Sequence, residues 1–265
     1  MHEKERHSAI LQAVKEQPVV TIEQLVALTD SSEATVRRDI TALHAQNRLR
    51  RVRGGAEAIN QPHLAGTPFA VNAMKNIAAK RAIANAAVEL CRDGEPIIIN
   101  GGTTTYQMVH QLAHRIMPVF TNSFPMAEYL LKHSKNVVTL PGGTIYREQN
   151  IILSPFENDM TQNFSAKRMF TGTQAISPFG IMESDPLLII AEQKLLSQAE
   201  ELIVLADSSK FKTHSSLVLC KLARVSMIIT DSGVDEREAA FIQEAGVKLN
   251  IVDLGIGVHE STLSA

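Results

Sequence analysis

Residues 31–55 read SSEATVRRDITALHAQNRLRRVRGG, and the interpretation of the whole chain begins from this stretch. It contains six arginines, although the protein as a whole has a net charge of −2 at pH 7. Val36, Ile40 and Leu43 recur at helical spacing, which predicts a helix with one buried stripe. A polyanion is the first candidate partner for positive charge concentrated in this way.

The opposite face of this helix is small and basic. It carries Ala34, Arg38 and Thr41, with Thr35 and Arg37 beside them. A short helix with such an outer face fits the major groove of DNA. We therefore expect Thr35, Arg37, Arg38 and Thr41 to read base edges.

Two more helices and a hairpin surround this helix. Thr21-Ile22-Glu23-Gln24 has the form of a capping box, and an earlier helix stops before Pro18. Ser32 is the expected N-cap of the basic helix, with residue 30 or 31 as the alternative. Gly54-Gly55 predicts the tip of a hairpin. The pattern is that of a winged helix-turn-helix.

The wing of this domain is basic. Arg50, Arg51 and Arg53 precede its tip, and we expect them on phosphates or in the minor groove. The full set expected to bind DNA is Thr21, Ser32, Thr35, Arg37, Arg38, Thr41, Arg50, Arg51 and Arg53.

Length and composition allow a second domain with its own core. The chain has 265 residues, of which 45% are hydrophobic and 20% charged, and it contains no apolar run of membrane-spanning length. Its first residues are too polar for a signal peptide, so a cytoplasmic location is expected. Cys91 and Cys220 are expected to be buried thiols. Because no histidine or cysteine has a metal-ligand spacing, we expect neither a metal nor a cofactor.

A domain boundary falls near Asn60. Residues 60–68, NQPHLAGTP, contain two prolines and a glycine and show no periodicity. We expect a DNA-binding domain at 1–58, a linker at 59–71 and a second domain at 72–265. An amphipathic helix is predicted over 72–90 at the start of the second domain.

The second domain alternates apolar runs with helical patterns, which predicts an α/β fold with a largely parallel sheet. The runs are PIIIN, PVFTN, VVTLP, RMFTG, ELIVLAD, SMIITD and VKLNIVD. Five runs end in small polar residues, near positions 100–105, 121–123, 141–144, 171–173 and 206–210. Since ligands bind at the carboxyl ends of parallel strands, these ends predict one small-molecule site.

The first of these ends, NGGTTT at 100–105, favours a phosphate. Its glycines let backbone N–H groups converge, its threonines add hydroxyl donors, and a helix predicted over 104–116 begins there. Lys210, at another strand end, supplies a cation. Neither the Walker A spacing nor the G-x-G-x-x-G spacing of nucleotide-binding loops is present, so a nucleotide is disfavoured. A glycine-rich turn with a threonine-capped helix remains the alternative without a ligand.

Several of these segments resemble the DeoR family of bacterial sugar-catabolism repressors. The resemblance rests on Arg6 with Ile10-Leu11, on SEATVRRDI at 32–40 and on RGGA at 53–56. It continues through NGGTTT, TNS at 121–123, PGG at 141–143 with Arg147, Glu192 with Lys194, and ADSSKF at 206–211. Residues 55–59, 152–155 and 191–196 are similar to the L-ascorbate-utilisation repressor branch of the family.

The resemblance implies a DNA-binding regulator whose effector domain has the fold of ribose-5-phosphate isomerases. The implied effector-binding residues are Asn100, Gly101, Gly102, Thr103, Thr104, Thr105, Thr121, Asn122, Ser123, Gly142, Gly143, Arg147, Lys194, Asp207 and Lys210. Asn100 and Gly101 replace the family's usual Asp-Ser, and Gln174 falls where the family has aspartate. These departures suggest a sugar that differs from the family's usual phosphosugars.

An isomerase with an accessory DNA-binding head is the alternative function. Isomerisation needs a carboxylate base, for which the candidates are Glu148, Glu183, Asp185, Glu192 and Asp207. We expect each to face solvent or to form a salt bridge. A DNA-binding head joined to a phosphosugar pocket instead favours a cytoplasmic repressor without turnover, responsive to a phosphorylated sugar or sugar acid. A single head contacts few bases, so a homo-oligomer, dimeric or tetrameric, is expected on operator DNA.

Overall fold

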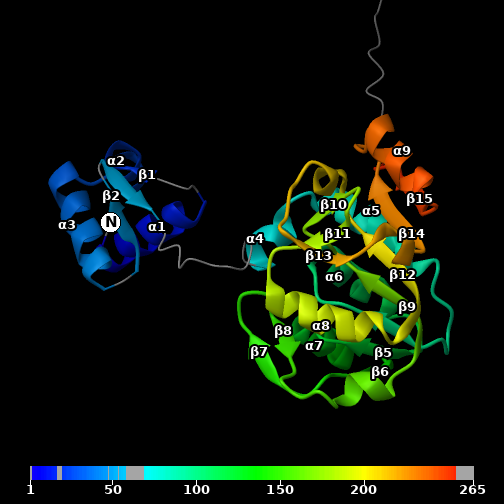
Figure 1. Ribbon diagram of the computed structural model, residues 1–265. Coiled ribbons are helices and arrows are strands. Elements are labelled where there is room, and N and C mark those ends of the chain that lie inside the picture. Colours follow the sequence, from blue (N-terminus) through cyan, green and yellow to red (C-terminus); the bar gives the residue numbers. More distant parts are fainter. Residues whose placement is uncertain (1, 17–19, 47, 53, 58–68, 255–265) are drawn as a thin grey trace, which may run out of the picture. The chain divides into compact units, whose positions relative to one another are not determined.

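The computed structural model describes residues 2–16, 20–46, 48–52, 54–57 and 69–254 (Figure 1). The chain divides into two compact units, Met1–His63 and Leu64–Ala265. The expected linker, 59–71, lies mostly outside the described residues, and its last three positions are helical because α4 begins at Phe69. No helix in the described part of the chain is long and apolar enough to cross a membrane.

The first unit is the predicted winged helix-turn-helix. Its elements are α1 (Glu3–Glu16), β1 (Val20–Thr21), α2 (Ile22–Thr29), α3 (Glu33–Ala45), β2 (Arg50–Val52) and β3 (Gly55–Glu57). Both predicted caps are confirmed: the hydroxyl of Thr21 accepts from the backbone N–H of Gln24, and that of Ser32 accepts from Thr35. Val36, Ile40 and Leu43 form the buried stripe of α3, as predicted.

Gly55 is required by the sheet of this unit. The strand order is β1-β3-β2, so β3 lies between two neighbours. A Cβ atom on Gly55 would lie 2.1 Å from the carbonyl oxygen of Val20, which no side chain tolerates. The glycine therefore lets β1 approach the hairpin closely.

The second unit contains the predicted parallel sheet. All seven predicted runs are strands of one sheet, in the order β15-β14-β12-β9-β4-β5-β6, and every printed pairing in it is parallel. The strands are β4 (Ile97–Ile99), β5 (Pro118–Thr121), β6 (Val137–Thr139), β9 (Ala166–Thr171), β12 (Ala199–Leu205), β14 (Met227–Asp231) and β15 (Lys248–Val252). Chain order therefore reverses between β4 and β9, which makes this pair the topological switch point of the sheet.

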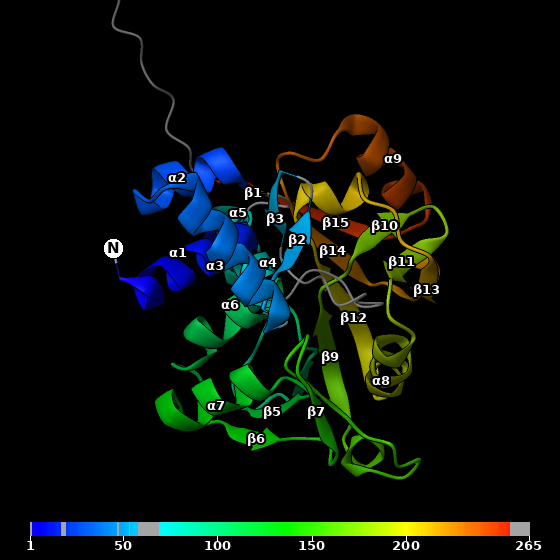
Figure 2. The ribbon, with the colours of Figure 1, turned by 90° about the vertical axis from the view of Figure 1, so that its left-hand side faces the viewer.

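Helices cover both faces of this sheet. Ile97 and Ile99 pack with α5 (Ile77–Val88), α6 (Thr103–Leu112) and α7 (Phe124–His133). Ile98, which points the opposite way, packs in a second core with α8 (Pro186–Leu196) and α9 (Glu236–Glu244). Figure 2 shows α6 and α7 on one side of β9 and α8 on the other.

Two helix predictions need correction. The helix predicted over 72–90 is broken into α4 (Phe69–Met74) and α5, because Asn76 adopts the left-handed conformation (φ 51°) between them. The helix predicted over 104–116 ends at Leu112, where the chain turns toward β5 and the N–H of Met117 donates to the side chain of Asn136.

Short antiparallel strands complete the unit. These are β7 (Thr144–Tyr146) with β8 (Ile151–Leu153), and a three-stranded sheet of β10 (Ala175–Ser177), β11 (Gly180–Glu183) and β13 (Leu217–Cys220). Three turns of 3-10 helix lie at Met160–Asn163, Ser208–Phe211 and Leu222–Arg224.

Candidate DNA-binding surface and ligand cavity

The outer face of α3 presents polar and basic side chains to solvent. Arg38 is exposed and forms no hydrogen bond or ion pair with any described residue. Arg37 is also exposed and forms an ion pair with Glu33 one turn earlier, 2.5 Å between Nη2 and Oε1. Thr35 is half-buried, and its hydroxyl lies 2.9 Å from that of Ser32. Arg38 is thus the basic side chain of α3 that is available without breaking another contact.

The wing lies beside this helix. Arg51 donates to the hydroxyl of Thr41 over 3.4 Å, and Thr41 donates to the carbonyl of Arg37. Arg50 forms an ion pair across the hairpin with Glu57. Arg53 lies outside the described residues. Among the described basic side chains of the wing, Arg51 therefore lies next to the predicted reading face.

The acid of α3 has a structural role. Asp39 is 5% exposed and accepts from Nε of Arg6 over 2.8 Å, while Nε2 of His7 lies 3.2 Å from its other oxygen. Burial alone would raise the pKa of Asp39, but the hydrogen bonds and charges of Arg6 and His7 outweigh it and lower that pKa. Asp39 therefore ties α1 to α3 as an ionised carboxylate.

We expect Asp39→Asn to destabilise the first unit. The substitution removes the carboxylate that pairs with Arg6 and His7, so the link between α1 and α3 should weaken. Because the folded-state pKa of Asp39 is lowered, its contribution is present above the ordinary aspartate pKa and disappears as the pH falls through the folded-state value. Hydrogen exchange of the α3 amides in the full chain measures the loss, with the exposed Glu33→Gln as control. Unchanged protection in Asp39→Asn would contradict this role.

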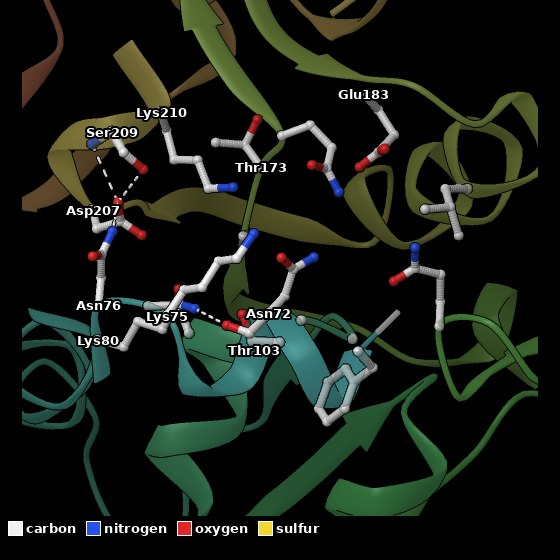
Figure 3. Close-up of a pocket in the computed structure, with 18 of the residues that line it drawn as sticks. Asn72, Lys75, Asn76, Lys80, Thr103, Thr173, Glu183, Asp207, Ser209 and Lys210 are labelled. Atoms are coloured by element: carbon white, nitrogen blue, oxygen red, sulfur yellow. Dashed lines mark hydrogen bonds between the residues drawn. The ribbon is translucent and has the colours of Figure 1, made fainter. Parts of the chain in front are cut away.

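A cavity lies in the second unit at the carboxyl ends of β4, β9 and β12, at the switch point of the sheet (Figure 3). It encloses about 110 Å³, which suits a small molecule rather than a polymer. Three of the five predicted strand ends supply its walls: Gly101 to Thr104, Gly172 to Gln174, and Asp207 with Ser209 and Lys210.

The loop after β4 is fixed by a buried network. Asn100 donates through Nδ2 to the hydroxyl of Thr171 (2.9 Å) and to Oε1 of Glu192 (2.7 Å), and its own oxygen accepts from Asn122. Asn122 in turn accepts from the N–H of Gly101. A Cβ atom on Gly101 would lie 2.4 Å from the Ile151 side chain. This network holds the loop in one conformation.

Other predicted effector residues support the loop without lining the cavity. Thr105 donates to the carbonyl of Asn100, Thr121 accepts from the N–H of Ser123, and Ser123 caps α7. All three are buried. Thr103 and Thr104, by contrast, line the cavity in the first turn of α6, where backbone N–H groups have no acceptor within the helix.

Three lysines line one part of the cavity: Lys75, Lys80 and Lys210 (Figure 3). Lys80 is 3% exposed, and its Nζ donates to the carbonyl of Asn72 without forming an ion pair with a described residue. Burial lowers the pKa of Lys80, although the charge of Asp207 partly opposes this effect. A buried ammonium group without a paired carboxylate is a costly arrangement that an anionic ligand would relieve.

Asp207 links this part of the cavity to the segment between α4 and α5. Its Oδ1 accepts from Nδ2 of Asn76 over 3.0 Å and from the N–H and hydroxyl of Ser209. The residue is buried and begins the 3-10 turn that carries Lys210. Asp207 thereby positions both Asn76 and Lys210 at the cavity.

Two acids, Glu183 and Glu192, line another part of the cavity. Each is 5% exposed and forms no ion pair with a described residue, so the expectation of a solvent-facing or salt-bridged acid is wrong for both. Burial raises the pKa of Glu192 to about 8, with Glu183 and Asp185 adding repulsion and Asn100 opposing it. Burial also raises the pKa of Glu183. Asp185 and Asp207 are buried as N-caps, again contrary to expectation.

Four predicted effector residues lie away from this cavity. Gly142, Gly143 and Arg147 are exposed on and before the β7–β8 hairpin, and none lines it. Lys194 donates to the carbonyl of Phe156 over 2.6 Å and lies 3.5 Å from Asp159. The motifs predicted these residues at the site, but the structure places them on or before the β7–β8 hairpin and on α8, outside the cavity lining.

Neither cysteine is placed to react. Cys91 is buried, which raises its pKa to about 12, whereas Cys220 is only half-buried, contrary to expectation, with its pKa raised by burial to about 11. In the described part of the chain, no three metal-ligating side chains come together.

Comparison with known proteins agrees with this geometry. Residues 6–62 match the DeoR-like helix-turn-helix domain, and residues 75–232 match the DeoR C terminal sensor domain. The chain belongs to the DeoR family. It is 32% identical over 94% of its length to the HTH-type transcriptional regulator UlaR of Shigella dysenteriae serotype 1 (strain Sd197) and of Escherichia coli (strain K12 / DH10B), covering 99% of each. It is therefore a DeoR-family helix-turn-helix transcriptional regulator with a sensor domain, and the expected fold class is confirmed.

Solved structures with distant likeness to this DeoR-family chain include two kinds of protein. Ribose 5-phosphate isomerase A from Methanocaldococcus jannaschii has a TM-score of 0.40 and 16% identity over 52% of this chain and 55% of its own. The eIF2B delta subunit from Chaetomium thermophilum has a TM-score of 0.39 and 13% identity, covering 79% and 63%.

Sequence reasoning missed Phe69, Asn72, Lys75 and Lys80 as cavity residues. The signal for Lys80 was present, because it falls on the same helical stripe as Ile77 and Ala84. A lysine on a buried helical stripe indicates a charged group with a functional role, such as ligand binding.

Proposed function

We propose that this protein represses a carbohydrate-catabolism operon in the cytoplasm, and that a phosphorylated sugar bound in the cavity releases it from operator DNA. Residues 1–58 act as the DNA-binding domain. The observation that carries the proposal is Lys80, a buried ammonium group that lines a cavity with Lys75 and Lys210 and forms no ion pair with a carboxylate of the described residues.

The phosphate is expected between these lysines and the first turn of α6. Thr103 and Thr104 line the cavity there, and the free N–H groups and dipole of the helix favour an anion. Charge-assisted hydrogen bonds from Lys80 and Lys210 add to this attraction. The departures at Asn100 and Gln174 alter the part of the site that recognises the sugar.

The residues of the cavity wall also suggest how ligand binding affects the DNA-binding domain. Phe69, Asn72, Lys75 and Asn76 all lie on or just after α4, the first described element of the second unit. A ligand that contacts this segment can favour one of its positions over another. It releases DNA only to the extent that it binds the DNA-incompetent state more tightly.

Paired heads are part of the proposal. One head reads few bases, so a dimer or tetramer that binds repeated sites is needed for strong specificity. The cavity is proposed to bind its sugar without converting it.

The test compares phosphorylated sugars with their unphosphorylated counterparts. We expect the phosphorylated member of one pair to release the full-length protein from DNA selected by the wild type, with the sugar phosphate recovered unchanged. The unphosphorylated member should fail at the same concentration, because it lacks the anion that Lys80 requires. Gel-shift titrations measure release from DNA and calorimetric titrations measure binding, for both members of each pair. Equal release by the two members would contradict the phosphate site, and turnover of the sugar would contradict a pure sensor.

A further inference from the structure

The two charged parts of the cavity lie apart from one another. Figure 3 shows Lys75, Lys80 and Lys210 with Asp207 on one side and Glu183 on the other. Among the described lining residues the cations are these three lysines. A bound molecule that spans the cavity therefore meets positive charge at one end and carboxyl groups at the other.

The carboxyl end of the cavity presents hydrogen-bond acceptors. Glu192 accepts from Asn100 through Oε1, and Glu183 accepts through Oε1 from the N–H of Ser184 over 2.7 Å and from its hydroxyl. Glu183 also accepts from the backbone N–H of Asp185, whereas no described residue donates to the second oxygen of Glu192. Buried acceptors of this kind are expected to be satisfied by a ligand or by water.

An unused donor lines the same cavity. Nε2 of Gln149 is buried and has no hydrogen-bond partner in the described structure. A sugar hydroxyl can satisfy both kinds of group, because it donates one hydrogen bond and accepts others. A carboxylate accepts only, so it could pair with Gln149 but not with an ionised glutamate.

We propose, building on the phosphate site proposed above, that the effector is anionic at one end only and presents uncharged hydroxyl groups at the other, with Glu183 and Glu192 as the specificity-determining residues. The ligand class is a phosphorylated polyol or neutral sugar rather than a phosphorylated sugar acid. When either Glu183 or Glu192 is ionised, a ligand carboxylate beside it would add a like charge to a buried acidic site, and such juxtaposition is strongly unfavourable.

The discrimination depends on pH in a defined direction. The titratable groups whose charges act on Glu192 are Glu183 and Asp185, and Glu192 in turn acts on Cys220. Because the pKa of Glu192 is raised to about 8, its carboxyl is mostly protonated at neutral pH and ionises above that value. Binding of a carboxylate-ended ligand should therefore weaken, relative to a hydroxyl-ended one, as the pH rises through about 8.

Matched probes of equal chain length test this inference by calorimetry on the full chain. The pairs are ribitol 5-phosphate with 5-phosphoribonate and glucitol 6-phosphate with 6-phosphogluconate, and inorganic phosphate serves as the common anion. We expect the hydroxyl-ended member of at least one pair to bind about tenfold more tightly near pH 9, with a smaller difference near pH 7. Any loss of charge on Lys80 affects both members of a pair alike, since they share the phosphate.

Two variants complete the experiment. Glu183→Gln combined with Glu192→Gln keeps the shape of both side chains and should remove the preference for hydroxyl-ended ligands. Glu200→Gln should keep this preference, because Glu200 is exposed and pairs with Lys167. Thermal unfolding verifies that the double variant is folded, and each single variant replaces it if it is not.

Carboxylate-ended probes that bind the wild type as tightly as their partners would overturn the inference. So would a preference that survives in a folded glutamine variant, or binding of inorganic phosphate with no binding of any pair. Failure of inorganic phosphate and every probe to bind would refute the phosphate site itself, and the inference with it.

Discussion

Replacing Lys80 by methionine is expected to abolish the response to the effector while leaving DNA binding intact. The substitution keeps the volume of a buried side chain but removes the ammonium group proposed to pair with the phosphate. Loss of a buried charge-assisted contact of this kind should weaken effector binding by about 100-fold, or roughly 3 kcal/mol. Calorimetry with the sugar phosphate and gel shifts with operator DNA measure the two properties separately.

The same variant should be no less stable than the wild type when the cavity is empty. Burial lowers the pKa of Lys80, so the charged form costs stability below that pKa, and the cost is relieved as the pH rises through it. Lys80→Met removes this stability cost at neutral pH, and its stability advantage over the wild type should diminish at alkaline pH. Lys132→Met, at an exposed lysine paired with Glu128 on α7, is the matched control. Unchanged effector affinity in Lys80→Met would refute the assignment of the phosphate to this lysine.

Arg38→Ala and Arg51→Ala are expected to weaken DNA binding in different ways. Arg38 is exposed on α3 and has no partner among the residues that the structure describes, so its loss should cost about 1–3 kcal/mol on the preferred sequence and relax sequence preference. Arg51 lies on the wing beside Thr41, so its loss should weaken binding to all sequences similarly and make binding less dependent on salt. Titrations against a selected and a scrambled duplex at several salt concentrations distinguish the two effects.

A further control uses the ion pair on α3. Glu33→Gln releases Arg37 from its partner without touching Arg38, so it should change affinity less than Arg38→Ala does. Identical salt and sequence profiles for Arg38→Ala and Arg51→Ala would contradict the division between base reading by α3 and phosphate binding by the wing.

The main elements of the fold could be predicted because their patterns are local and strong. Continuous apolar runs identified all seven strands of the parallel sheet, since both faces of that sheet are covered. The short strands β10, β11 and β13 were not predicted: β13 reads LVLC, an apolar run, but all three strands pair antiparallel outside the main sheet. The break at Asn76 was also hidden, since a single left-handed residue leaves helical periodicity on both sides unchanged.

The site was predicted less completely than the fold. Three of the predicted strand ends line the cavity, but the direction of each side chain depends on partners that are distant in sequence. Lys194 is held by Phe156 and Asp159, for example, and so does not line the cavity. Glu192 of α8 is buried, and its donor is Asn100 at the end of β4, far away in the sequence. Contacts between elements of this kind have no signature in a single sequence.

Phe69 has a practical consequence. Its ring lines the cavity and packs edge-on against Tyr106, with ring centroids 5.9 Å apart, while its N–H donates to the carbonyl of Glu148. The chain contains no tryptophan and only three tyrosines. A tryptophan introduced at this position would therefore be the sole indole fluorophore of the protein, with a tyrosine close enough to transfer excitation to it. Its emission would report occupancy of the cavity and the environment of α4 in the intact, unlabelled regulator, in real time.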